Sequence, residues 1–137
     1  MKFNKYINIP YKHQGRDFNG CDCLGLARLI LNTETNAKIG DYSELKYDKN
    51  WYKKHNHIID NIKNDWIEVT KPYKIFDILL FWTVRQGYCD HIGLYIGDNK
   101  FIHIQEDHVS QIDKLELFWK EALYKAIRYK DGIKLNG

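Results

Sequence analysis

The chain places a cysteine, Cys23, where a nucleophile could be activated. Asn19 and Gly20 are typical of a turn, and Asp22 is typical of a residue that caps a helix. This order predicts a helix from about Asp22 to Asn32, with Cys23 in its first turn. Unpaired backbone N–H groups and the positive end of the helix dipole favour a thiolate there. A thiolate, unlike a thiol, is a competent nucleophile.

A cysteine nucleophile needs an imidazole that takes and returns its proton, and a third polar group that fixes the imidazole tautomer. His91 is the best candidate for the base, because it opens an apolar stretch typical of a strand. His103 lies in the next strand of the same predicted hairpin. The other histidines lie in polar stretches and are interpreted as solvated surface groups: His13, His55, His57 and His108.

Hydrophobic patterning predicts the elements that position these residues. The helix at 22–32 should bury Leu26, Leu29 and Ile30, while 33–50 is polar and irregular. A second helical region is predicted around 50–64, a buried strand at 76–82, a hairpin of 91–96 and 100–104, a helix over 113–122 and a closing strand at 123–129. A helix followed by a mostly antiparallel sheet is an α+β architecture.

Bulk properties exclude several classes of protein. The length of 137 residues suggests one domain, and 44% hydrophobic with 28% charged residues excludes a disordered chain. The net charge is only +3 and no basic run is dense, which argues against nucleic-acid binding. No signal peptide or membrane-inserting stretch is visible, so we expect synthesis without standard export. Three cysteines, an odd number, argue against a disulfide framework.

Three motifs occur in an order that resembles the NlpC/P60 cysteine peptidases. The first comprises Pro10-Tyr11, Gly15 and the run at 20–26, the second is the strand at 76–81, and the third is the hairpin at 91–103. Together these matches cover roughly residues 10–104. The Gly15-Arg16-Asp17 to Asp22-Cys23 arrangement looks most like the phage-tail branch of the family.

The resemblance implies a papain-like fold over a single domain, 1–137, in which the N-terminal helix carries the nucleophile. Cys23 would be the nucleophile, His91 the base and His103 the orienting residue, with the Cys23 backbone N–H in the oxyanion hole. Tyr11 and Asp22 match positions that line the substrate site. The implied reaction is hydrolysis of amide bonds in peptidoglycan peptide stems, often next to D-glutamate, without a cofactor or metal. Leu24 departs from the family, since many members carry a substrate-holding serine there.

The turn of the hairpin decides which residue can orient His91. A two-residue turn at Asp98-Asn99 would place His91 and His103 on opposite faces, with His91 facing Glu106. A longer turn or a bulge, with Asn99 in the left-handed conformation, would return both imidazoles to one face. Following the family, we expect His103 to orient His91, with Glu106 as the alternative.

The expected setting is a phage tail. The enzyme would be made in the host cytoplasm without a signal peptide, be carried by the virion, bind peptide stems and contact tail proteins. A cytoplasmic amidase or peptidase of the same fold that acts on free muropeptides is the first alternative. The others are a structural tail protein without activity and a zinc-binding protein that uses Cys21, Cys23, Cys89 and His91.

Overall fold

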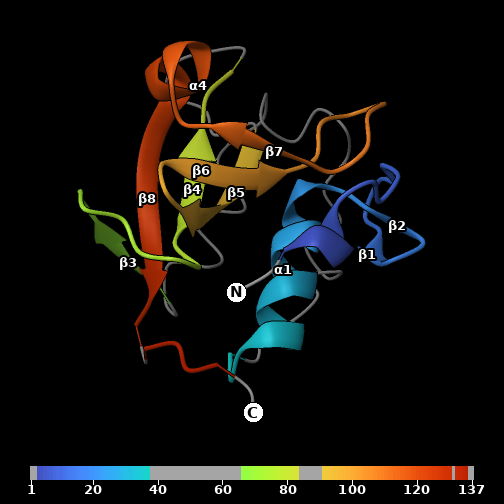
Figure 1. The fold of residues 1–137 in the computed structure, drawn as a ribbon, viewed down its shortest axis with the longest axis horizontal. Coiled ribbons are helices and arrows are strands. Elements are labelled where there is room, and N and C mark those ends of the chain that lie inside the picture. Colours follow the sequence, from blue (N-terminus) through green and yellow to red (C-terminus); the bar gives the residue numbers. More distant parts are fainter. Residues whose placement is uncertain (1–2, 38–65, 84–90, 131, 136–137) are drawn as a thin grey trace.

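The computed structural model describes residues 3–37, 66–83, 91–130 and 132–135. Figure 1 shows helix α1 beside a twisted sheet, with the short α4 at one end of that sheet. Along the chain the elements are η1 (Asn4–Tyr6), β1 (Arg16–Asp17), β2 (Gly20–Cys21), α1 (Cys23–Glu34), β3 (Trp66–Val69), β4 (Ile78–Phe81), β5 (His91–Gly97), β6 (Lys100–His103), β7 (Gln111–Lys114), α4 (Leu117–Ala122) and β8 (Leu123–Tyr129). The predicted helical region at 50–64 lies outside the described residues.

The main sheet has six strands in the order β3-β8-β4-β5-β6-β7, and every neighbouring pair is antiparallel. The predicted α+β class is confirmed, as are the strand within 76–82, the hairpin and the closing strand. The sheet brings the last strand, β8, between β3 and β4. Residues near the C-terminal end of the sequence therefore hold the centre of the sheet together.

Strand β4 explains why the core has two halves. All four of its residues are buried, and successive side chains of a strand point to opposite faces. Ile78 and Leu80 join the cluster against α1, whereas Leu79 and Phe81 join the cluster on the opposite face. A short continuous apolar run is typical of a strand that is covered on both sides, and β4 is covered on both sides here.

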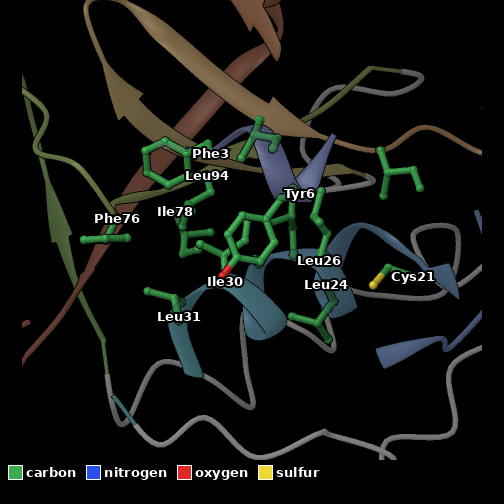
Figure 2. Packing of buried hydrophobic residues seen from close by; sticks show 14 of the residues in the cluster. Phe3, Tyr6, Cys21, Leu24, Leu26, Ile30, Leu31, Phe76, Ile78 and Leu94 are labelled. Atoms are coloured by element: carbon green, nitrogen blue, oxygen red, sulfur yellow. The ribbon is translucent and has the colours of Figure 1, made fainter. Parts of the chain in front are cut away.

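The face of α1 that packs on the sheet carries the larger half of the core. Leu24, Leu26, Ile30 and Leu31 are buried there and meet Ile78 and Leu94 from the sheet, as Figure 2 shows. Leu29, which the sequence also predicts to be buried, is only partly covered. This packing fixes α1, and with it the residue at its start, relative to β5.

The predicted helix at 113–122 is wrong over its first part. Gln111–Lys114 form strand β7, which pairs with β6, and the helix is only the short α4, Leu117–Ala122. Tertiary pairing with the edge of β6 decides the conformation here, because it supplies ladder hydrogen bonds that an isolated turn of helix does not. Within the described ranges, neither helix is long and apolar enough to cross a membrane.

Candidate active site

Asp22 fixes the start of α1 and thereby the position of Cys23. Its backbone is extended, and its Oδ1 accepts a hydrogen bond of 2.8 Å from the backbone N–H of Gly25, which is the geometry of an N-cap. The carboxylate also accepts a 2.9 Å hydrogen bond from Arg16 and another of 2.9 Å from the backbone N–H of Gln14. The predicted cap is confirmed, and one carboxylate ties the helix to the preceding loop.

Close contact between that loop and α1 requires glycine at position 25. A Cβ on Gly25 would lie 1.9 Å from the carbonyl oxygen of Gly15, far inside any real contact. A larger residue would therefore push the helix away from the loop and displace the neighbouring Cys23.

The Cys23 thiol lies against the main chain at the start of β5. Burial of the sulfur, followed by the charge of Asp22, raises the pKa of the thiol to about 12, although backbone hydrogen bonds from Ile92 and Leu24 lower it. Burial therefore opposes the predicted thiolate in the substrate-free protein. The helix start supplies N–H donors, as expected, but they stabilise the charged sulfur less than burial destabilises it.

Two imidazoles lie directly beside each other on the hairpin. Nε2 of His91 is 2.7 Å from Nδ1 of His103. His103 pairs with Gly93 in the β5–β6 ladder, so His91 and His103 share one face as diagonal neighbours. The structure thus brings together the two histidines that the sequence singles out.

The turn explains why both imidazoles reach the same face. The register between β5 and β6 shifts between Tyr95 and Gly97, and Gly97, Asp98 and Asn99 all have positive φ angles, of 95°, 52° and 60°. The bulged form of the hairpin is confirmed. Glu106 is exposed and lies beyond the end of β6, and it is His103 that contacts Nε2 of His91.

Asp113, which the sequence does not single out, contacts His103 and so adds a third side chain to the pair of imidazoles. Oδ2 of Asp113 on β7 lies 2.7 Å from Nε2 of His103 and accepts a 2.8 Å hydrogen bond from the side chain of Gln111. Asp113 pairs with Phe101 and Gln111 pairs with His103, so all these side chains share one face. The apolar residue Ile112 between two polar neighbours is the only sequence signal for this strand.

Trp119 of α4 covers both imidazoles. Its ring centroid lies 5.5 Å from that of His91 and 4.8 Å from that of His103, and it also packs on Phe81 and Phe101. Burial, together with the neighbouring His103, lowers the pKa of His91 to about 3. Burial also lowers the pKa of His103, against the opposing effect of Asp113. Both imidazoles are therefore neutral at neutral pH.

Tyr11 enters the same region from the N-terminal arm. It forms a bridge with Cys21, and its backbone N–H donates to the carbonyl of His108 at 3.1 Å. Burial raises the pKa of its phenol, and the negative forms of Cys23 and Asp22 raise that pKa further, which places the ring within their electrostatic reach. A substrate contact by Tyr11 or Asp22 stays a prediction, as does the oxyanion role of the Cys23 N–H.

The residues of the zinc alternative are only partly described. Cys89 lies outside the described residues. The Cys21 thiol is buried and donates to the carbonyl oxygen of Asp17 at 3.0 Å. Burial raises the pKa of Cys21 to about 12, so it is a structural thiol with its hydrogen already engaged.

Comparison with known sequences gives a consistent result. Residues 8–128 match the model of the NlpC/P60 family. Over 123 residues, the chain is 29% identical to the probable peptidoglycan endopeptidase LytE of Bacillus subtilis, which covers 90% of this chain and 31% of that protein. It is 27% identical over 117 residues to the tail tip assembly protein K of Escherichia phage N15, covering 80% of this chain and 45% of that one. The chain thus spans less than half the length of either relative.

Solved structures of low sequence identity share the fold. The NlpC/P60 domain of the peptidoglycan hydrolase SagA has a TM-score of 0.57 at 24% identity and covers 91% of both chains. An NlpC/P60 family protein from Bacillus cereus has a TM-score of 0.63 at 21% identity, over 90% of this chain and 36% of the other. The predicted papain-like arrangement, with a helix against an antiparallel sheet, is confirmed by this likeness.

Proposed function

Because the chain belongs to the NlpC/P60 family, whose model matches residues 8–128, we propose that it is a cysteine endopeptidase of peptidoglycan peptide stems. In this proposal Cys23 is the nucleophile, His91 is the general base and His103 orients His91. One observation carries it. His91, whose imidazole contacts His103, is the first residue of β5, and the backbone of the next residue, Ile92, hydrogen-bonds the Cys23 sulfur.

The proposed reaction begins from a neutral thiol and a neutral imidazole. Nδ1 of His91 takes the proton of the Cys23 thiol as the sulfur attacks the carbonyl carbon of the stem amide, forming a C–S bond. The imidazolium then gives that proton to the leaving amine as the C–N bond breaks. Water, deprotonated by the same imidazole, cleaves the thioester, releases the acid and restores the thiol.

A neutral resting pair suits a buried site. A permanent thiolate and imidazolium would both need solvation that burial withholds, and the raised pKa of Cys23 and lowered pKa of His91 reflect that cost. Proton transfer is then coupled to attack on the substrate, when charge moves from sulfur to the carbonyl oxygen. The backbone N–H of Cys23 would stabilise that oxygen, since a helix start supplies unpaired donors.

The substrate class is proposed from the family and from the relative in Bacillus subtilis, named as a probable peptidoglycan endopeptidase. Tyr11 and Asp22 would line the groove beside the nucleophile. Both oxygens of Asp22 already accept hydrogen bonds from the chain, including one from Arg16, so its effect on substrate would be mainly electrostatic. Leu24 offers no hydroxyl to a stem amine, which favours a substrate end different from that of serine-bearing members.

The setting is proposed to be a phage tail, on the strength of the similarity to a tail tip assembly protein. Such an enzyme would open the wall locally while tail proteins hold it against the surface, and tethering would raise its effective concentration at the substrate. The alternative is a peptidase of free muropeptides. Intact sacculi should be the better substrate of a tail enzyme, and free stem peptides the better substrate of a recycling enzyme.

The test is digestion of purified sacculi and of free stem peptides, with mass spectrometry of the products. Wild-type protein should release fragments with new amine and carboxyl ends at one stem bond, and Cys23→Ala should release none. Cys21→Ala is the matched control, because it removes a neighbouring thiol that donates only to a backbone carbonyl. Equal release by the wild type and Cys23→Ala would refute the nucleophile, and metal analysis that finds one zinc per chain, bound by Cys23, would favour the zinc alternative.

A further inference from the structure

His91, His103 and Asp113 form a chain of hydrogen bonds at the sheet edge, and donor and acceptor can be assigned along it. A carboxylate only accepts hydrogen bonds, so Asp113 requires the hydrogen of His103 on Nε2, 2.7 Å away. A neutral His103 then has an unprotonated Nδ1, which must accept. The partner at 2.7 Å is Nε2 of His91, which must carry its own hydrogen. A neutral His91 is thereby left with an unprotonated Nδ1.

From this geometry we infer that Asp113 is a positioning residue that sets the tautomers of both histidines and so makes Nδ1 of His91 the basic nitrogen. The inference rests on the proposed function for its catalytic consequence, whereas the tautomers themselves belong to the resting protein. His103 alone cannot set this direction, because a neutral imidazole donates equally well from either nitrogen. With the opposite order, His103 would donate from Nδ1 and His91 would carry its hydrogen on Nδ1.

The surroundings of Asp113 support a fixed orientation. Its Oδ2 receives both the His103 hydrogen bond and one of 2.8 Å from Nε2 of Gln111. Gln111 is the ladder partner of His103, so the same strand pairing holds the carboxylate and places it diagonally across from the imidazole. His103 is 1% exposed, which shields its hydrogen bonds from exchange with water. The Asp113 side chain is 33% exposed, so the chain of hydrogen bonds ends at the surface.

Because Oδ2 of Asp113 accepts both hydrogen bonds, two variants can separate the effect of the charge from that of the hydrogen bonds. Asp113→Asn can present its carbonyl oxygen in place of Oδ2 to both donors, so it keeps the hydrogen bonds and removes the charge. Asp113→Ala removes both. Glu116→Gln is the control, because it removes an exposed carboxylate three positions along that makes no capping hydrogen bond to α4.

Nitrogen-15 NMR of histidine-labelled protein near neutral pH reads the tautomers without any substrate. In the wild type, both rings should carry hydrogen on Nε2 and show an unprotonated Nδ1. Asp113→Asn and Glu116→Gln should keep this pattern, and Asp113→Ala should give a mixture of tautomers. A wild-type His91 protonated on Nδ1 overturns the inference even if no variant folds, and an unmixed pattern in a folded Asp113→Ala also overturns it.

Digestion of sacculi by the same proteins measures how the tautomers affect kcat and KM. Asp113→Ala should lower kcat roughly 10- to 100-fold, the weight of a hydrogen bond to a charged group, with KM nearly unchanged. Asp113→Asn should recover most of that loss, and Glu116→Gln should match the wild type. Wild-type kcat in Asp113→Ala overturns the role of Asp113, whereas a wild type with the stated tautomers and no hydrolysis overturns the proposed function alone.

Discussion

Two hydrogen-bond networks, each containing an aspartate, differ in the charge of the group that the aspartate binds. Asp77, which is 1% exposed, binds Arg128 through two hydrogen bonds of 2.7 and 2.8 Å and also accepts one of 2.8 Å from the backbone of Lys74. Asp113 instead binds a neutral imidazole, which binds a second one. The first network pairs two opposite charges and ends there. The second connects Asp113 on β7 through His103 on β6 to His91, the candidate base, on β5.

The first network therefore serves mainly the stability of the fold, and the second serves the proposed reaction. The Asp77–Arg128 pair joins the residue before β4 to β8, so it fixes the centre of the sheet. The row of His91, His103 and Asp113 lies on strands β5, β6 and β7, towards the other edge of that sheet. Loss of a partner in the first network should lower the stability of the fold, and loss of one in the second should slow the reaction while leaving the fold.

The largest expected effect is on the catalytic side. His91→Ala should lower kcat by roughly 10³-fold, because a positioned general base contributes rates of that order. Among the described histidines, His91 is the one that adjoins Ile92, whose backbone hydrogen-bonds the Cys23 sulfur. Initial rates on sacculi, with circular dichroism to check the fold, measure it. A folded variant within tenfold of the wild type would remove His91 from the proton-transfer step.

The second effect is on the stability side. Asp77→Ala should lower the free energy of unfolding by about 1.5–3 kcal/mol, since it removes the hydrogen bonds of a buried carboxylate to Arg128, whose side chain is 26% exposed and can be solvated afterwards. Urea denaturation measures this change. Lys125→Ala is the control, because its ion pair with Glu68 joins side chains that are 38% and 59% exposed and should cost at most about 1 kcal/mol.

The third effect tests whether His103 only orients its neighbour. His103→Ala should lower kcat roughly 10- to 100-fold, less than His91→Ala, because the base remains but loses the acceptor of its Nε2 hydrogen. KM should change little. If both histidine variants lose the same activity, the two rings act as one unit and the division between base and orienting residue does not hold.

Sequence patterns could predict the parts of this site that depend on local signals. The turn at Asn19-Gly20 and the cap at Asp22 place Cys23, and the left-handed turn before Lys100 brings His91 and His103 to one face. Asp113 could not be predicted, because its place depends on a four-residue strand at the sheet edge whose register with β6 is a tertiary property. Trp119 has the spacing of a core residue, and only the position of α4 makes it the cover of the imidazoles.

The effect of burial on the thiol could not be predicted for a related reason. A helix start and its N–H donors are visible in the sequence, but the burial of the sulfur by β5 is not. His91 is buried on the other face of the sheet, against Phe81 and Trp119, so the resting charges of the two groups follow from packing on both faces. Local position indicates where a nucleophile can lie, and tertiary packing sets its protonation.

The smallest expected effect is on the pH dependence of the free energy of unfolding, to which the histidines of the second network contribute. The folded-state pKa of His91 is about 3, below its ordinary value of 6.5, so between these values the unfolded chain binds more protons and stability falls as the pH falls. His91 should contribute a slope of about 1.4 kcal/mol per pH unit at most, and His103, whose pKa is also lowered, adds to it. Urea denaturation at several values between pH 6.5 and 5 measures this slope above the range where carboxylates titrate. His91→Phe should flatten it and Lys125→Ala should not. An equal slope in His91→Phe would mean that burial does not hold the imidazole neutral.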